Sequence, residues 1–335
     1  MKKILITGGA GFVGAHIVEG ILKNTDWDIY ILDRLDLSGN LERLRDINVW
    51  EKEKHRVNFF WHDLKSEIPN AILNEINDSN YVWHIAASSH VDRSIDNPAL
   101  FVLDNVLGTT NILLACRKMS NIENIVYFST DEVFGPAPGE VKYREWDRYN
   151  SGNPYAASKA GGEEMAVAFA NTYKLPIMVT HTMNIFGERQ HPEKFIPLVI
   201  SKILKGEPVT IHSNRDKTKA GSRFYIHARN VCDALLFLVK KGEFLDGSGR
   251  RGKYNIVGEK EMDNLELAEF IAKVIGKPLK YEMIDFHSSR PGHDLRYALD
   301  GELMKSIGWD LPRNFEDSLE KTIKWYLENK KWINL

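Results

Sequence analysis

The stretch Thr7–Gly14, which reads TGGAGFVG, ends the first apolar run of the chain and opens its first amphipathic stretch. Its glycines have separate uses: Gly8 allows a tight turn, Gly11 lets the backbone approach a pyrophosphate, and Gly14 permits close packing of a helix on a strand. The N-terminus of the following helix offers free N–H groups and a positive dipole end to an anion. The stretch therefore predicts a dinucleotide-binding turn between a strand and a helix.

An acidic residue stands where such a turn requires one. Asp33 ends the second apolar run, 19 residues after Gly14. A carboxylate there accepts hydrogen bonds from the adenosine ribose and repels a 2′-phosphate, which predicts NAD rather than NADP. Arg34 follows directly and counts against that preference. Asp63, after the third run, either reaches the adenine amino group or caps a helix or turn.

Short runs rich in β-branched and aromatic residues alternate with amphipathic stretches through the first half of the chain. The runs predict buried strands, at 4–7, 29–33, 57–61, 81–86, 124–129 and 177–182. The amphipathic stretches predict helices at 11–24, 66–77, 98–119 and 154–174. Repeated strand–helix alternation implies right-handed crossovers and a parallel sheet covered on both faces. The predicted fold class is α/β, with a Rossmann-type doubly wound parallel sheet.

After about residue 180 the alternation loosens. Short strands are predicted at 209–212, 254–257 and 280–284, and helices at 194–205, 230–242, 264–275 and 314–329. The polar stretch 213–222 predicts an exposed loop. We expect an NAD-binding domain over 1–180, with a return segment near 222–245, and a smaller mixed α/β domain over 181–335 that mainly binds the substrate.

The composition excludes several classes of protein. The 335 residues carry 44 Lys and Arg against 46 Asp and Glu, a net charge of -2, so a nucleic-acid partner is not expected. Two cysteines exclude a disulfide framework and fit a reducing compartment. No apolar run approaches the roughly 18–20 residues that span a bilayer, and the N-terminus is interpreted as a first strand rather than a signal peptide. We expect a cytoplasmic protein that binds neither membrane nor metal.

The sequence Tyr155-Ala-Ala-Ser-Lys159 opens one of the predicted helices. Tyr155 and Lys159 are four residues apart and share a helical face. A free tyrosine titrates near 10, and a neighbouring ammonium lowers that pKa by favouring the phenolate. The pair can therefore take a proton from a carbinol while hydride leaves to a nicotinamide.

A hydroxyl and two carboxylates, Thr130, Asp131 and Glu132, follow the fifth predicted strand. Ligands of open α/β sheets bind at the carboxyl ends of the strands, so these groups are expected in the active site. Thr130 can hydrogen-bond the reacting oxygen. Two adjacent carboxylates can differ in pKa, one acting as an acid and one as a base. A simple alcohol dehydrogenase needs only the tyrosine and the lysine. Two further acid or base groups therefore imply extra proton transfers, such as those that eliminate water, unless these carboxylates only cap a helix.

Together these motifs resemble the extended short-chain dehydrogenase/reductase family, and within it the nucleotide-sugar 4,6-dehydratases. The resemblance covers essentially the whole chain, and its most specific motifs are the triplet 130–132 and the segment 290–294, RPGHD. It implies a lyase that converts a nucleotide-diphosphate hexose, with dTDP-glucose favoured and a UDP-sugar next, to the 4-keto-6-deoxyhexose. It also implies tightly bound NAD, regenerated in each turnover, and a homodimer formed through the helices near 98–119 and 154–174.

The resemblance assigns roles to the candidate residues. Tyr155, with Lys159 and Thr130, would remove the C4 hydroxyl proton; Glu132 would remove the C5 proton; and Asp131 would protonate the departing C6 hydroxyl. The expected cofactor contacts are Gly8, Gly11, Phe12, Val13, Gly14, Asp33, Asp63, Leu64, Ala86, Ala87, Tyr155 and Lys159. The expected substrate contacts are Ser89, Thr130, Asn184, Lys194, Phe195, Arg223, Asn255, Asn264, Arg290 and His293.

The chain departs from the family pattern at three single positions, and the longer, basic stretch 213–222 replaces the family's glycine-containing turn before the pyrophosphate arginine. Ser88 stands where the family usually has glutamate, Asp104 where it has threonine, and Ile185 where it has a second asparagine. Two other functions remain open on the sequence alone. One is a 4-epimerase or decarboxylase on the same scaffold, and the other is a non-catalytic NAD-binding regulator.

Overall fold

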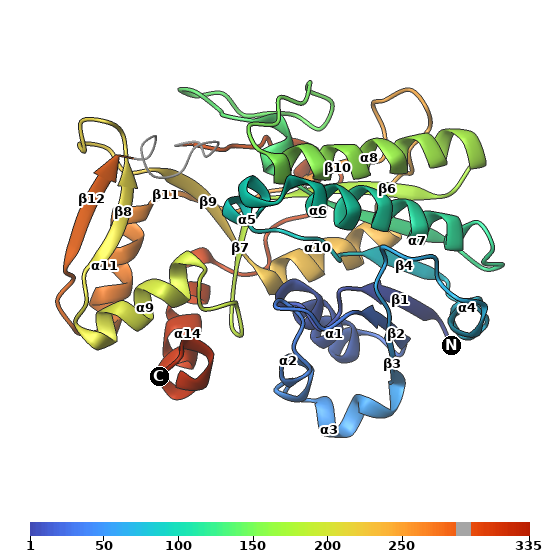
Figure 1. Ribbon diagram of the computed structural model, residues 1–335, viewed down its shortest axis with the longest axis horizontal. Coiled ribbons are helices and arrows are strands. Elements are labelled where there is room, and N and C mark those ends of the chain that lie inside the picture. Colours follow the sequence, from blue (N-terminus) through green and yellow to red (C-terminus); the bar gives the residue numbers. More distant parts are fainter. Residues whose placement is uncertain (286–295) are drawn as a thin grey trace.

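The computed structural model describes residues 1–285 and 296–335 (Figure 1). Its main sheet is parallel throughout, in the order β10-β6-β5-β4-β1-β2-β3. The strands are β1 (Lys3–Thr7), β2 (Asp28–Asp33), β3 (Val57–Trp61), β4 (Tyr81–His84), β5 (Asn124–Thr130), β6 (Ile177–Thr182) and β10 (Lys253–Ile256). The predicted α/β doubly wound fold is confirmed. The continuous apolar runs form strands because both faces of the sheet are covered.

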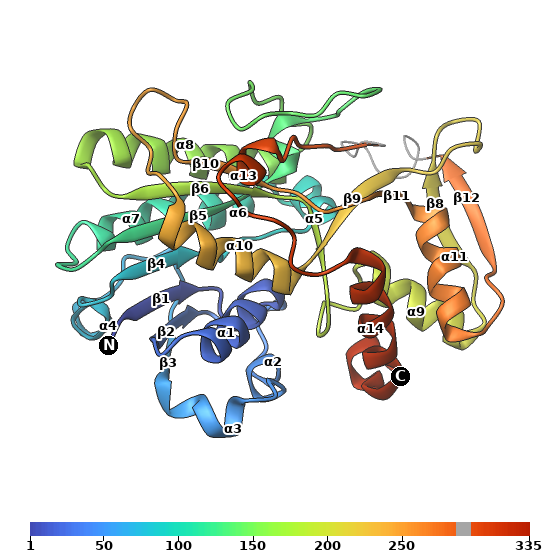
Figure 2. The ribbon, with the colours of Figure 1, turned by 180° about the vertical axis from the view of Figure 1, so that it is seen from behind.

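Helices cover the two faces of this sheet, as Figure 1 and, from behind, Figure 2 show. On one face α1 (Phe12–Asn24) packs against α10 (Ala228–Lys241). On the other face one apolar core joins α4 (Asn70–Ile76), α7 (Gly108–Cys116) and α8 (Pro154–Tyr173). The N-terminal glycine turn leads directly into α1, which places the start of that helix at the carboxyl edge of the sheet.

The predicted helix 98–119 is built from three segments. These are α6 (Pro98–Val102), a π-helical stretch (Leu103–Leu107) and α7. Contrary to the sequence prediction, the combined helix is long and apolar enough to cross a membrane, judged by length and composition only. Half of it is buried inside the fold, and its Ile112 and Leu113 belong to the core beside α8.

The later part of the chain forms a second apolar core. It contains a two-stranded sheet, β8 (Val209–Ser213) with β12 (Tyr281–Asp285), and helices α9 (Phe195–Lys205), α11 (Asn264–Ile275) and α14 (Phe315–Glu328). Beside it lies a three-stranded sheet of β11 (Glu261–Asp263), β9 (Ser222–His227) and β7 (Asn184–Phe186). These three strands were not predicted; β7 and β11, of three residues each, are too short to show a period. The remaining elements are α2 (Glu42–Arg45), α3 (Trp50–Glu53), α5 (Val91–Asp96), α13 (Glu302–Ser306) and 3-10 turns at Lys54–Arg56, Asp131–Phe134 and Lys330–Ile333.

Strand β10 corrects the sequence analysis. The run 254–257 was expected in the later region, yet β10 pairs with β6 at the edge of the main sheet, Tyr254 opposite Thr180. Helix α10, in the expected return segment, also lies on that sheet, against α1. The chain therefore returns twice to the first region. Strand partners are chosen by tertiary packing, which a single run of residues does not show.

Candidate active site

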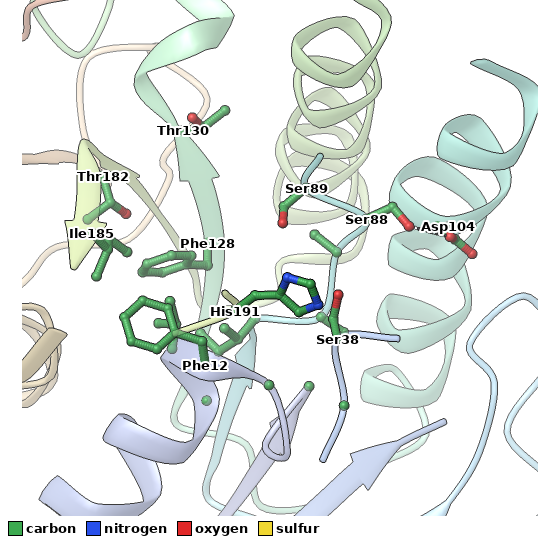
Figure 3. A pocket seen from close by; sticks show the side chains of 18 of the residues that line it. Phe12, Ser38, Ser88, Ser89, Asp104, Phe128, Thr130, Thr182, Ile185 and His191 are labelled. Carbon is green, nitrogen blue, oxygen red and sulfur yellow. Dashed lines mark hydrogen bonds between the residues drawn. The ribbon is translucent and has the colours of Figure 1, made fainter. Parts of the chain in front are cut away.

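A cavity of about 400 Å³ opens at the carboxyl ends of the parallel strands. The strand order reverses between β1 and β4, and this switch point is where open α/β sheets bind ligands. The cavity is lined by every predicted catalytic and cofactor residue, and by four more predicted substrate residues: Ser89, Asn184, Lys194 and Phe195. Figure 3 shows part of this lining, with the side chains of Phe12, Phe128 and Thr130 among those labelled; Thr130 ends β5.

The glycine turn has the shape that a diphosphate needs. Gly8 has a φ of +74°, and a Cβ there would lie 2.8 Å from the Cα of Ala86. A Cβ at Gly14 would collide with the Gly8 carbonyl, whereas one at Gly11 would meet only that oxygen, at 3.1 Å, and otherwise point into open space. No side chain caps the start of α1 among the described residues. The turn therefore presents bare backbone and a helix N-terminus to the pocket, which fits a dinucleotide.

Asp33 is fixed at the end of β2. Its two carboxylate oxygens accept hydrogen bonds from the backbone N–H groups of Leu35, at 2.8 Å, and Ala10, at 3.0 Å. Burial raises the pKa of Asp33. Because each carboxylate oxygen can accept two hydrogen bonds, capacity remains for ribose hydroxyls. Asp63 also lines the pocket, where it faces Lys65 at 3.3 Å and Arg34 at 3.5 Å.

Asp131 begins the 3-10 turn that follows β5, and it is buried. Its Oδ1 accepts a hydrogen bond from the Thr130 hydroxyl at 3.1 Å, while its Oδ2 has no hydrogen-bond partner among the described residues. Burial, and then the neighbouring Glu132, raise the pKa of Asp131 to about 7. A carboxyl group in this state holds a proton near neutral pH and can donate it.

Glu132 is oriented by a residue of the next helix. The Asn153 side-chain amide donates to Glu132 Oε2 at 2.9 Å, and its Oδ1 accepts from the backbone N–H of Ala156 at 2.8 Å. Asn153 is thus the N-cap of the helix that carries Tyr155 and also a support for Glu132. Sequence reasoning missed this second role, although an asparagine directly before Pro154 is a recognisable helix start.

Tyr155 and Lys159 are 8% and 3% exposed, on the first turns of α8. The prediction that Lys159 lowers the pKa of Tyr155 is wrong: burial, and then Glu132, raise that pKa well above its ordinary value. Burial likewise lowers the pKa of Lys159 to about 7. Lys159 Nζ lies 4.4 Å from the Tyr127 ring centroid, and the Tyr127 hydroxyl donates to the Lys159 carbonyl at 2.8 Å. Neither residue is among the causes of the other's shift, so burial dominates both pKa values and the pair interaction that the spacing suggested does not contribute.

Three predicted substrate residues do not line the cavity. Asn255 is fully buried, and its side-chain amide donates to the carbonyls of Tyr143 and Asp300, at 2.9 and 3.0 Å. This corrects its expected role, because those bonds fix it within the fold. Asn264 lies behind the lining residue Tyr225, whose hydroxyl donates to it at 2.9 Å.

Arg223 also stands outside the lining. Its guanidinium lies 4.8 Å from the Tyr297 ring centroid and donates to the Ser222 carbonyl at 2.7 Å. Its charge still reaches Asp131, since it lowers the pKa of that carboxyl against the larger effect of burial. Arg290 and His293 lie outside the described residues.

The pocket also contains residues that sequence reasoning did not assign to it. They come from several separate elements, and among them are Asp36, Arg43, His62, Lys65, Phe128, Gln190, His191 and Tyr225. Phe128 had a signal, since it precedes the Ser-Thr-Asp-Glu sequence on a predicted strand. Ile185, one of the three departures, lines the pocket beside Thr182 (Figure 3).

Comparison with known proteins agrees with this geometry. The family model described as GDP-mannose 4,6 dehydratase matches residues 5–322. The dTDP-glucose 4,6-dehydratase of Salmonella typhimurium is 38% identical to the chain, over 99% of this chain and 94% of that relative. This chain belongs to the GDP-mannose 4,6 dehydratase family. It is an NAD-dependent nucleotide-sugar 4,6-dehydratase with the extended short-chain dehydrogenase/reductase fold, which confirms the resemblance seen in the sequence.

Solved structures show the same architecture. The dTDP-glucose 4,6-dehydratase DesIV of Streptomyces venezuelae, with NAD and TYD bound, superimposes with a TM-score of 0.86, at 31% identity over 98% of both chains. A UDP-glucose 4-epimerase from Thermus thermophilus, in complex with NAD, gives a TM-score of 0.84 at 27% identity, over 97% of this chain and 99% of that chain. Because epimerases share the fold, fold alone does not separate the two reactions.

Proposed function

We propose that this enzyme eliminates water from dTDP-glucose, with Tyr155, Lys159, Thr130, Asp131 and Glu132 as its catalytic residues. The observation that carries the proposal is the buried Asp131 carboxyl, with its pKa near 7, in one cavity with Glu132 and Tyr155. An acid, a base and a phenol in one pocket supply the proton transfers of an elimination. The proposal that the nucleobase of the substrate is thymine rests on the relatives, which are named for dTDP-glucose.

The first step removes the proton of the C4 hydroxyl. Tyr155 is the acceptor in its phenolate form; because burial raises the pKa of its hydroxyl, the phenolic proton must first pass to the neutral amine of Lys159, one turn further along α8. Lys159, whose own pKa is near 7, exchanges its proton readily at neutral pH. The glycine turn and Asp33 would hold NAD, which would supply an acceptor for the C4 hydride and a donor of hydride to C6.

The second step removes water. A ketone at C4 acidifies the C5 proton, which the Glu132 carboxylate takes while Asn153 holds it in place. Asp131 gives its proton to the departing C6 hydroxyl. Two carboxyl groups in different surroundings, one buried and one oriented by an amide, thus take the acid and base roles.

The choice of nucleotide is tested by steady-state kinetics with dTDP-, UDP-, GDP- and CDP-glucose. The proposal predicts the highest kcat/KM for dTDP-glucose. A higher kcat/KM for another of these sugar nucleotides would contradict the proposed nucleobase. It would not contradict the dehydration reaction.

We propose that the enzyme is a homodimer through the helix 98–116. Val102, Leu103 and Leu107 are 52%, 44% and 38% exposed on it, an apolar stripe that a second copy would cover. Sedimentation equilibrium at micromolar concentration is expected to give a dimer, and the double variant Leu103→Glu, Leu107→Lys a monomer. A monomer for the unmodified protein would contradict the proposal.

We also propose a cytoplasmic location, because Cys116 and Cys232 are free thiols, as is usual in a reducing compartment.

The acid role of Asp131 predicts a pH dependence. Its pKa is raised by folding, so the protonated form stabilises the native state at low pH, and that contribution is lost as pH rises through about 7. The kcat/KM of dehydration is expected to fall above the same pH, while Asp131→Asn shows a low and flatter profile. Thermal unfolding provides a second readout: Asp131→Asn should stabilise the fold more at pH 8 than at pH 5, by about 1.4 kcal/mol for each pH unit between pH 5 and the pKa near 7, seen as a larger rise in Tm at pH 8. Equal changes in Tm at both values would contradict this prediction.

Asn153 is predicted to act as a positioning residue for Glu132. Asn153→Ser keeps an N-cap oxygen but loses the amide that reaches Glu132, so dehydration should fall about tenfold with little change in Tm. Asn153→Asp keeps the N-cap oxygen, but its carboxylate repels Glu132. Its rate of dehydration is therefore expected to be lower than that of Asn153→Ser. In both variants C4 oxidation, measured as reduced nicotinamide, should be nearly unchanged. A parallel loss of oxidation and Tm would instead show a merely structural role.

A further inference from the structure

The guanidinium of Arg34 lies in the cofactor pocket but is held by carboxylates. Its Nε and Nη2 donate to Asp36 Oδ2 at 2.8 and 2.6 Å. Its Nη1 and Nη2 donate to the two oxygens of Asp104 at 2.6 and 2.9 Å. Nη1 also lies 3.5 Å from Asp63 Oδ1. Both edges of the guanidinium fork are therefore engaged, one of them in a bidentate pair.

Asp104 reaches Arg34 from a distant part of the chain. It lies on the π-helical stretch Leu103–Leu107, and its side chain is almost fully buried. The Ser88 hydroxyl donates to Asp104 Oδ2 at 2.5 Å, the contact drawn in Figure 3. The side chain of Asn105 in turn bonds the backbone N–H and carbonyl of Ser88, each at 2.9 Å. Two of the three departures from the family pattern, Ser88 and Asp104, thus meet at one contact that fixes the carboxylate.

This arrangement resolves the conflict between Asp33 and Arg34. An arginine near the ribose accommodates the 2′-phosphate of NADP, whereas a carboxylate favours the free hydroxyls of NAD. Arg34 would have to break a bidentate pair to bind a phosphate, and the phosphate would then face Asp33, Asp36, Asp63 and Asp104. Like charges in a partly buried pocket repel strongly.

We propose that Asp104 is a specificity-determining residue that makes the pocket selective for NAD by holding Arg34. The inference rests on dinucleotide binding in this pocket and not on which sugar nucleotide is the substrate. Removal of the Asp104 charge would free one edge of the guanidinium for a 2′-phosphate. The effect requires Arg34, so the two residues should be coupled.

The test is a nucleotide-exchange measurement that needs no catalysis. The purified enzyme is incubated with equal excess NAD and NADP, freed of unbound nucleotide and denatured, and the released nucleotides are quantified. The unmodified protein is expected to retain NAD almost exclusively. Asp104→Asn should raise the NADP:NAD ratio about 10- to 100-fold, the range of one or two charge-assisted hydrogen bonds. The double variant Asp104→Asn, Arg34→Gln should return the ratio close to that of the unmodified protein.

An unchanged ratio in Asp104→Asn, or an increase that persists in the double variant, would overturn the proposal. If Asp104→Asn does not fold, Asp36→Asn serves instead, because Asp36 binds the other edge of the fork near the surface. It should shift the ratio in the same direction by a smaller factor, and no shift would overturn the proposal. If the unmodified protein retains neither nucleotide, the assignment of this cavity as a dinucleotide-binding site is itself overturned.

Discussion

Replacing Glu132 by glutamine is expected to slow the loss of water about 100- to 10,000-fold, the usual contribution of a positioned acid or base. Glutamine has the same shape and can keep the contact with Asn153, but it cannot take the C5 proton. Oxidation at C4 should persist, because Tyr155 and the cofactor cradle are unchanged. The measurement follows the dehydrated product by mass spectrometry and the reduced nicotinamide by absorbance.

Glu140→Gln is the matched control, since Glu140 is an exposed carboxylate in the loop that follows the same turn. It should turn over at the rate of the unmodified enzyme. An epimerase or decarboxylase would need no base at Glu132. Turnover largely intact in Glu132→Gln would therefore favour those reactions and contradict the roles assigned here.

Replacing Tyr155 by phenylalanine should have an equally large effect, at an earlier step. The variant keeps the buried ring but loses the group that accepts the C4 proton, so oxidation and dehydration should fall together by about 100- to 10,000-fold. NAD should stay bound, because the glycine turn and Asp33 hold it without this hydroxyl. The readouts are reduced nicotinamide on mixing with substrate and the amount of NAD released on denaturation.

Tyr143→Phe provides the comparison, since its hydroxyl donates only to the Pro136 carbonyl among the contacts described, at 2.8 Å. It should retain full oxidation. Oxidation by Tyr155→Phe at a rate close to that of the unmodified enzyme would remove Tyr155 from its assigned role.

The fold could be predicted because its signals are local. The glycine turn, the apolar runs and Asp33 each lie within one stretch of sequence, and right-handed crossovers then leave few topologies. The same rules place strand ends together, so the residues after β1, β2, β4 and β5 were expected to meet. The structure does bring these groups into one cavity.

The rest depends on contacts between distant residues. Arg34 and Asp104 are separated by 70 positions, so their pairing has no local pattern. The pKa of Tyr155 depends on how deeply it is buried, which a four-residue spacing does not show. Asn255 matched a family position but is fixed by backbone carbonyls within the fold. In each case packing and desolvation outweighed the local signal.

The most direct test of the central claim is incubation of the purified protein with dTDP-, UDP-, GDP- and CDP-hexoses, including the N-acetyl forms, without added NAD. Each reaction is followed by mass spectrometry. The enzyme is expected to give a product lighter by one water from a single nucleotide series, dTDP-glucose in particular, with NAD supplied by the protein. No loss of water from any sugar nucleotide, with or without added NAD, would contradict the central claim. A product of unchanged mass but altered retention would then indicate an epimerase, and inertness with NAD bound would indicate a regulator.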